Sequence, residues 1–255
     1  MLLAQTNRHC QISPVNTVCR LCLKPTKLCN SHIIPEFCYG LLYDPKHRYH
    51  SMTDVDAGKV EFEQKGIRER LLCPDCEQKL SIWENYASKF FKTTLPQPLN
   101  DELKSIRVQG VDYRRFKLFL LSVLWRASVS SHPFFEHVEL GPHEERIRAM
   151  LANEDPGRPE DYGCVIFSLQ FRGKNLRDFF VEPMPARVDN HKCYRFVFAG
   201  FVFVYFVSSH AMRLGMRACF LQLKGSLVVL QSELWDFAYL RELWERFRSS
   251  RAPTN

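Results

Sequence analysis

The sequence predicts an α+β fold, in which a cysteine-rich N-terminal module and a helical segment precede a mainly antiparallel sheet with a C-terminal helix. Three observations support this prediction. Seven of the ten cysteines lie within the first 76 residues. Apolar residues then recur with helical spacing, and beyond residue 163 short runs rich in Val, Phe and Tyr are typical of strands. We therefore divide the chain into modules at 1–94, 95–162 and 163–255.

The composition is that of a globular protein. Of the 255 residues, 45% are hydrophobic and 25% are charged, which excludes a disordered tail, a coiled coil and a collagen-like chain. The net charge of +7 allows a polyanionic partner but does not identify one. The first residues, MLLAQTNRHCQ, lack the pattern of a secretory signal. We therefore expect a cytoplasmic protein, in which paired cysteines more often bind a metal than form disulfides.

Three segments have the spacing of helices. The first begins at Cys73, and the two prolines of the segment 95–102 end it and mark a linker. The segment 113–130 is apolar enough to be a mostly buried helix, and a charged helix follows at about 142–152. On the second helix we expect four basic residues to lie on solvated edges: Arg114, Arg115, Lys117 and Arg126.

The C-terminal third has the composition of a sheet. Its expected strands are 164–171, 178–183, 193–207, 219–223 and 226–230. The apolar run Phe196–Val207 is shorter than the about 20 residues of a membrane helix, so we predict a buried central strand and no membrane association. The final segment, 232–248, is amphipathic and is predicted to be a helix with Ser232 as its cap.

Two CxxC motifs are the strongest signal in the sequence. CRLC holds Cys19 and Cys22, and CPDC holds Cys73 and Cys76. Each motif places two thiolates on one tight turn, where they can supply half of a tetrahedral zinc site. Two such turns complete a four-cysteine structural Zn²⁺ site, and metal binding would then contribute directly to folding.

A second ligand set is also open. Cys19, Cys22, Cys29 and His32 have the spacing C-x2-C-x6-C-x2-H, which could close a compact site alone. That arrangement would leave the second CxxC motif two ligands short, so we prefer the four-cysteine set.

The segment LCNSHIIPEF (28–37) lies between the two motifs. The order CxxC…HIIP…CPDCE resembles that of the HNH endonucleases (ββα-metal or His-Me finger), in their zinc-stapled form. The resemblance covers residues 15–92. In that family a short hairpin after the first CxxC carries a histidine, and the second CxxC opens a helix that faces it. The full layout is also similar to bacterial proteins of undefined function that share this N-terminal region.

The resemblance implies roles for particular residues. His32 matches the general base that activates water, and Pro35 matches the turn that closes the hairpin strand. Glu77 matches the helix position that helps to hold a catalytic Mg²⁺ or Mn²⁺, and Glu84, two turns later, could add a second carboxylate. The chain departs from the family at Ser31, where a carboxylate or histidine is usual. Other acidic residues nearby are Glu36 and Asp75.

These observations lead to two functional hypotheses. The first is a metal-dependent endonuclease that acts on nucleic acid, more specifically DNA, with bacterial defence against foreign DNA as one setting. The second, which Ser31 favours, is a non-catalytic zinc module that binds nucleic acid or a protein partner. The C-terminal domain could also bind a protein partner, and the sequence leaves the oligomeric state open.

Overall fold

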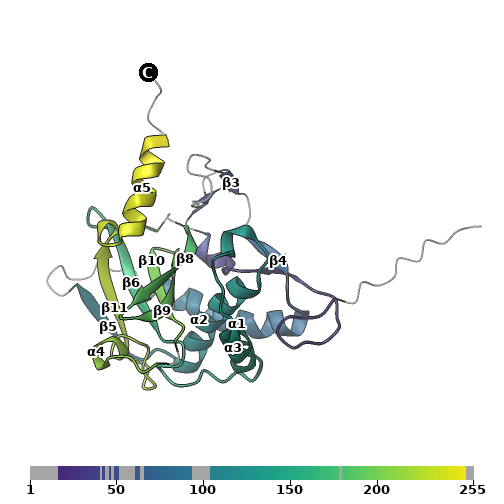
Figure 1. Cartoon of the computed structure of the whole chain (residues 1–255). Helices are drawn as coiled ribbons and strands as arrows, with labels where there is room; N and C mark the ends of the chain where they lie inside the picture. The colour runs from purple at the N-terminus through teal and green to yellow at the C-terminus, as the bar shows by residue number, and fades with distance from the viewer. Residues whose placement is uncertain are drawn as a thin grey trace, which may run out of the picture.

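The computed structural model describes residues 17–40, 42–43, 46, 49–51, 61–63, 66–93, 104–177, 180–208 and 210–250. The predicted linker, 95–102, lies outside the described residues. The α+β prediction is confirmed, because the described residues form five α-helices and a seven-stranded sheet. Figure 1 shows the sheet and the helix α5 on one side of the molecule, and α1, α2 and α3 on the other.

The N-terminal module is built on two short strands and a long helix. Strand β1 (Asn30–His32) pairs antiparallel with β4 (Arg68–Arg70), so His32 lies opposite Arg68. A separate pair, β2 (Tyr49–Ser51) with β3 (Glu61–Glu63), lies between them in the chain. Helix α1 (Pro74–Thr93) begins within the second CxxC motif and buries its apolar stripe, which includes Leu80, Trp83, Ala87 and Phe90.

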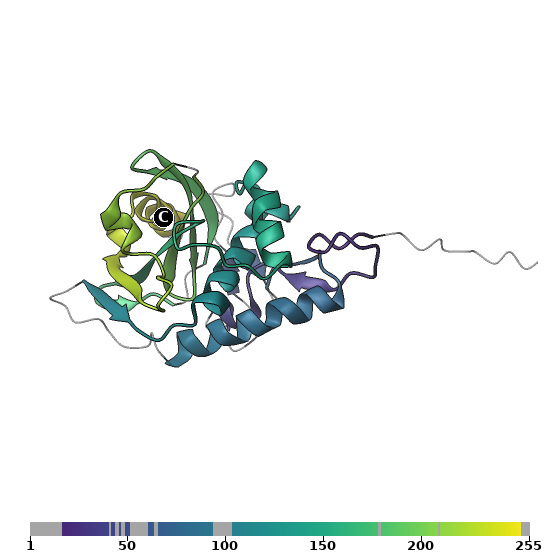
Figure 2. The ribbon, with the colours of Figure 1, turned by 90° about the horizontal axis from the view of Figure 1, so that it is seen from below.

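Helix α2 (Tyr113–Val129) is the central helix. Its N-terminus is capped by Asp112, whose side chain accepts a hydrogen bond of 2.9 Å from the backbone N–H of Arg115. Between Phe116 and Ala127 every residue of α2 is buried, and the helix contacts both α1 and α3 (Pro142–Ala152). In Figure 2 α2 lies between the sheet and the long helix α1.

Two of the four basic residues on α2 are not on solvated edges, so that expectation was wrong for them. Lys117 is 2% exposed and Arg126 is 1% exposed. The Lys117 ammonium donates to the carbonyl of Tyr162 at 3.0 Å, and Arg126 pairs with Glu84. A buried cation is tolerated only where it has such partners. These partners lie elsewhere in the chain, so helical position alone did not distinguish the buried Lys117 and Arg126 from exposed basic residues.

The large sheet has the strand order β5-β11-β6-β10-β9-β8, with β7 paired to β6. The pairing of β11 with β6 is parallel and all the other pairings are antiparallel, which confirms a mainly antiparallel sheet. The strands are β5 (Ser105–Val108), β6 (Cys164–Phe171), β7 (Lys174–Asn175), β8 (Val181–Val188), β9 (His191–Phe198), β10 (Phe201–Phe206) and β11 (Leu227–Glu233).

The run 193–207 forms a hairpin, and the prediction of one central strand was wrong. β9 and β10 pair directly, with Phe198 opposite Phe201. The two connecting residues, Ala199 and Gly200, have φ angles of 54° and 83°. Positive φ at both central positions is typical of the type I′ turn that joins two-residue hairpins, and Gly200 was the available signal for it.

Two other expected elements were also wrong. The segment 219–223 is not a strand but follows the short helix α4 (Leu214–Arg217) as turns, in which the Gln222 amide donates to the carbonyls of Arg217 and Phe220. Ser232 caps no helix, because it lies in β11 opposite Leu169. The C-terminal helix α5 (Ala238–Ser250) starts later, after a 3₁₀ turn, η3 (Leu234–Asp236).

Both faces of the sheet are covered by helices. Alternation along β10 places Phe201, Phe203 and Tyr205 in the core shared with α1 and α2, and Val202, Val204 and Phe206 in the core beneath α5. The first core is continuous from the N-terminal cysteines through α2 to the sheet. Figure 2 shows α5 end-on against the curved sheet. None of the helices in the described ranges has the length and apolar character needed to cross a membrane.

Candidate functional site

The two CxxC motifs occupy two different local structures. Cys19 and Cys22 lie on a tight turn in which the backbone N–H of Leu23, at a φ of 60°, donates to the Cys19 carbonyl. Cys73 and Cys76 lie at the start of α1, where the backbone N–H of Glu77 donates to the Cys73 carbonyl. These two segments are joined through Arg20, whose backbone N–H donates to the carbonyl of Leu71 at 2.9 Å.

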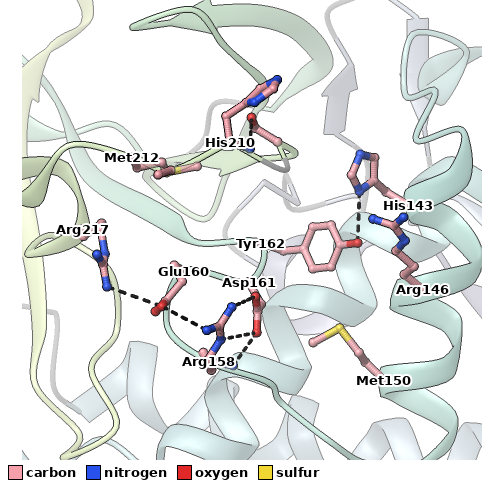
Figure 3. Close-up of a pocket in the computed structure, with 12 residues that line it drawn as sticks. His143, Arg146, Met150, Arg158, Glu160, Asp161, Tyr162, His210, Met212 and Arg217 are labelled. Carbon is pink, nitrogen blue, oxygen red and sulfur yellow. Dashed lines mark hydrogen bonds and ion pairs between the residues drawn. The ribbon is translucent and has the colours of Figure 1, made fainter.

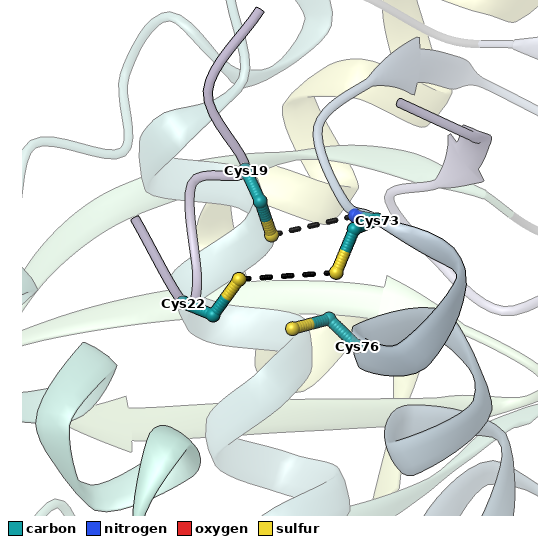
Figure 4. Close-up of side chains that lie close together, drawn as sticks. All are labelled: Cys19, Cys22, Cys73 and Cys76. Atoms are coloured by element: carbon teal, nitrogen blue, oxygen red, sulfur yellow. Dashed lines mark hydrogen bonds between the residues drawn. The ribbon is translucent and has the colours of Figure 1, made fainter. Parts of the chain in front are cut away.

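The four sulfur atoms converge on one point. Figure 4 shows the side chains of Cys19, Cys22, Cys73 and Cys76 directed toward one another, and all four sulfur atoms lie within 4.8 Å of one another. The Cys22 and Cys73 sulfur atoms are 3.8 Å apart. Tetrahedral zinc at about 2.3 Å from each sulfur requires sulfur–sulfur distances of about 3.8 Å. The cluster therefore could hold a metal ion such as Zn²⁺.

Burial makes this cluster electrostatically unfavourable without a cation. It raises the pKa of the Cys73 and Cys76 thiols above their ordinary value; it acts in the same direction on Cys19, but hydrogen bonds from backbone N–H groups outweigh it there and lower the pKa of that thiol. Four thiolates at this separation would also repel one another. A divalent cation removes both costs, because it binds the thiolate form. The second ligand set is not assembled: in the described part of the chain this is the one group of three or more potential ligands that converges, and it excludes Cys29 and His32.

His32, at the end of β1, lies between an acid and a base. Its Nε2 is 2.5 Å from the Glu36 Oε2, and the Arg68 Nε is 2.8 Å from the same ring nitrogen. One nitrogen cannot both donate to Glu36 and accept from Arg68. In the structure the Arg68 Nε–H donates to Nε2, so a proton on Nε2 requires Arg68 to turn to the Glu36 carboxylate, which its Nη2 already approaches at 3.5 Å. We adopt this tautomer because an unprotonated nitrogen at 2.5 Å from a carboxylate would be repelled.

The surroundings keep His32 neutral near pH 7. Burial lowers its pKa below the ordinary value of 6.5, and the positive charge of Arg68 lowers it further. The negative charge of Glu36 and its hydrogen bond act in the opposite direction. With the proton on Nε2, the basic nitrogen is Nδ1, which has no hydrogen-bond partner within the described ranges. A neutral imidazole with one oriented edge has the chemistry of a general base.

The two predicted carboxylates of α1 do not contact this imidazole. The Glu84 Oε1 lies 2.7 Å from the Arg126 Nη2, and the Arg126 Nη1 donates to the His32 carbonyl at 2.7 Å. Glu84 is thus connected to His32 through Arg126. Glu77 is half-buried, and its Oε1 is buried without a hydrogen-bond partner among the described residues. Ser31 is 1% exposed and its hydroxyl is likewise unpartnered there.

Sequence reasoning missed the two contacts that organise this site. Glu36 was noted as a nearby acid, and its position four residues after His32 was a usable signal for the pair. Arg126 gave no such signal, because it lies 94 residues from His32 in the chain.

A polar cavity lies elsewhere, beside α3. It has a volume of about 530 Å³ and is lined by residues of α3 and of the loops that include Tyr162 and His210. Figure 3 shows Arg158 paired with Asp161, Arg217 directed at Glu160, and the His143 ring against the Tyr162 hydroxyl. Most of its charged groups are therefore already paired, and none of its lining residues belongs to the cysteine cluster or contacts His32.

Fold and site together define a mixed α+β protein with a candidate four-cysteine metal centre in its N-terminal module. No family model matches the chain, and no curated protein or solved structure is significantly similar to it.

Proposed function

We propose that this protein is a metal-dependent nuclease that hydrolyses phosphodiester bonds in nucleic acid, with His32 as the general base. The observation that carries this proposal is the placement of His32 between Glu36 and Arg68 at the end of β1. The antiparallel pair β1–β4, which carries His32, and helix α1, which starts at the second CxxC motif, support this proposal, although β1 and β4 are separated by residues 33–67 and do not form a short hairpin. A role in defence against foreign DNA is part of the same proposal.

The Glu36–His32 pair suits proton abstraction. Glu36 fixes the ring through Nε2, so that Nδ1 can take a proton from water. The Glu36 carboxylate, which is 45% exposed, would then stabilise the imidazolium that forms, as the acid hydrogen-bonded to a catalytic histidine does. Glu36 would therefore be a positioning residue and His32 the catalytic residue.

Exposed basic side chains support a polyanionic substrate. Arg68 and Arg70 lie on β4, and Arg20, Lys24 and Lys27 lie on or just after the turn of the first CxxC motif. Cations of this kind contact backbone phosphates without reading the sequence. They favour nucleic acid as a substrate class.

A bound Mg²⁺ or Mn²⁺ would rest chiefly on Glu36, because Glu77 and Glu84 do not converge with it on one point in the described part of the chain. Such ions are commonly held by one or two carboxylates together with water and substrate phosphates. Glu36 supplies a carboxylate beside the imidazole, and Glu77 has a buried oxygen without a partner in the described ranges. Glu84 would contribute its second oxygen, because its Oε1 is paired with Arg126. Such an ion, when bound, stabilises negative charge on the leaving oxygen.

Plasmid nicking tests the proposal. Zinc-loaded protein is incubated with supercoiled DNA and Mg²⁺ or Mn²⁺, beside His32→Ala and the control His137→Ala, which alters an exposed histidine. We expect cation-dependent nicking that falls by about 10²–10⁴-fold in His32→Ala alone. Nicking that persists in His32→Ala would contradict the assignment of the base.

A second candidate function is a non-catalytic zinc module that binds nucleic acid. Two observations favour this non-catalytic function. Ser31, whose hydroxyl replaces the usual metal ligand, is buried, and Glu84 is already paired with Arg126. Absence of nicking with either cation, together with anisotropy-detected binding of labelled DNA or RNA that weakens in Arg68→Gln, would support this function over the nuclease.

A further inference from the structure

An apolar cavity lies on the sheet face that is covered by α4 and α5. Its volume is about 650 Å³, within the range of about 300–1,000 Å³ typical of small-molecule sites. Strands β6, β8, β9, β10 and β11 form its floor, and α4 and the residue before α5 close its sides. Its apolar lining includes Val165, Phe167, Val204, Phe206, Leu230 and Phe237. No residue of the cysteine cluster and no neighbour of His32 contributes to it.

Arg195 is a charged residue within this apolar wall. It lies on β9 opposite Val204 of β10, on the face that also carries Cys193 and Val197. Its Nε is buried and has no hydrogen-bond partner among the described residues. Within the same described part of the chain no carboxylate lies within ion-pairing distance of its guanidinium, which instead stacks at 4.0 Å from the centre of the Tyr239 ring.

This arrangement leaves a positive charge without an anion. A partly buried guanidinium that lacks a counterion loses hydration, and stacking on an aromatic ring replaces only part of it. Arg187 and Arg213 line the same cavity, whose single carboxylate is that of Asp189, 3.7 Å from Arg213. Three guanidinium groups thus share one acidic residue around an otherwise apolar space.

We propose that this cavity binds a small amphipathic carboxylate, whose apolar chain fills the space and whose carboxylate pairs with Arg195. Planar guanidinium and planar carboxylate can form two parallel hydrogen bonds, and such a pair would satisfy the buried Nε. A single negative charge fits this site better than a phosphate ester does, because the greater charge of a phosphate costs more to transfer into an apolar cavity. The proposal is independent of the nuclease.

Calorimetric titration of the full chain tests it, with decanoate and its neutral counterpart 1-decanol as probes, each below its aggregation limit. We expect the wild type to bind decanoate about tenfold more tightly than decanol, because only the carboxylate can form charged hydrogen bonds with the Arg195 guanidinium. Arg195→Met keeps the apolar wall and should bind the two probes equally. Arg241→Met, which removes an exposed arginine of α5, should behave as the wild type.

A cavity-filling variant provides a second readout. Ala186 lines the cavity from β8, and Ala186→Leu should weaken both probes while leaving the fold intact, as checked by circular dichroism and thermal unfolding. If the wild type binds neither probe, binds them equally, or keeps its preference in Arg195→Met, the proposal is overturned. If Arg195→Met does not fold, the weakening of both probes by Ala186→Leu and the decanoate preference of Arg241→Met decide the question.

Discussion

Arg126 and Glu84 form an ion pair at 2.7 Å that joins α2 to α1, and Arg126 also donates to the carbonyl of His32. The guanidinium is 1% exposed, and the Glu84 side chain is 22% exposed. The strand that carries the candidate base is thus anchored to a charge buried in the centre of the protein. Loss of the Arg126 side chain would remove a hydrogen bond to the His32 backbone and so affect the position of His32, although Arg126 does not contact the imidazole.

Breaking this pair should strongly destabilise the fold. We expect Arg126→Met to lower the free energy of unfolding by about 3 kcal/mol, because the partner carboxylate is left beside an apolar core. The double variant Arg126→Met/Glu84→Gln should lose less than the sum of the single variants in a urea-melt cycle. Arg115→Met, which removes a surface pair with Asp112, should cost less than about 1 kcal/mol. If the losses in the free energy of unfolding of the two single variants simply add in the double variant, the contact between Arg126 and Glu84 is contradicted.

The His32 environment makes a prediction about pH. Because burial and the charge of Arg68 lower the His32 pKa below 6.5, the unfolded chain takes up a proton before the folded protein does. His32 should therefore cost stability as the pH falls below 6.5, and this acid loss should be smaller in His32→Gln. Urea melts of the two proteins between pH 7.5 and 5 measure the difference.

The same pKa should respond to its neighbours. Arg68→Gln removes a nearby positive charge and should raise the His32 pKa, whereas Glu36→Gln should lower it further. NMR titration of the imidazole protons measures both shifts. Arg70→Gln, an exposed change on the same strand, is the matched control and should leave the titration unaltered. An unchanged pKa in Arg68→Gln would show that this guanidinium does not lie against the ring.

The cysteine cluster predicts a metal content. We expect the purified protein to carry a single zinc ion, and Cys76→Ser to lose it together with much of its resistance to thermal unfolding, because metal affinity is coupled to folding. Cys29→Ser should retain the zinc, since Cys29 lies outside the cluster. Elemental analysis by mass spectrometry measures both variants. Zinc loss in Cys29→Ser would favour the second ligand set.

Two hairpin turns offer a matched comparison of glycine substitutions. Gly173 and Gly200 have φ angles of 73° and 83°, so alanine is strained at each. At Gly173 an added Cβ meets nothing within 4 Å, whereas at Gly200 it would lie 2.3 Å from the Asn175 Oδ1. We expect Gly173→Ala to cost about 1 kcal/mol of stability and Gly200→Ala distinctly more. If thermal unfolding shows equal losses of stability in the two variants, the close approach of Asn175 to Gly200 is contradicted.

Local patterns predicted those parts of the molecule that depend on neighbours in the chain. The helices predicted at 113–130 and about 142–152 and the four-cysteine cluster followed from spacing, and the strand at 164–171 followed from its composition. The hairpin within 193–207 was missed because its continuous apolar content outweighed a single glycine. The start of the C-terminal helix was misplaced because β11 is extended by pairing with β6, a contact that local propensity does not contain.

The candidate site divides in the same way. The spacing of the two CxxC motifs predicted the cysteine cluster that the structure assembles, whereas the role of His32 stays a prediction. The sequence did not identify Arg126 as a buried partner of Glu84, because an arginine on an apolar helix has the same pattern whether its side chain is buried or exposed. Contacts between distant segments therefore account for most of what the structure added.

Strand β11 lies between β5 and β6, although it is the last strand of the sheet in the chain. During synthesis β5 and one edge of β6 therefore remain unpaired until residues 227–233, which form β11, leave the ribosome. Unpaired edges of this kind invite pairing with other chains. A polypeptide that stops before residue 227 would keep such an edge permanently, so truncation from the C-terminus is expected to give an aggregating product rather than a smaller folded one.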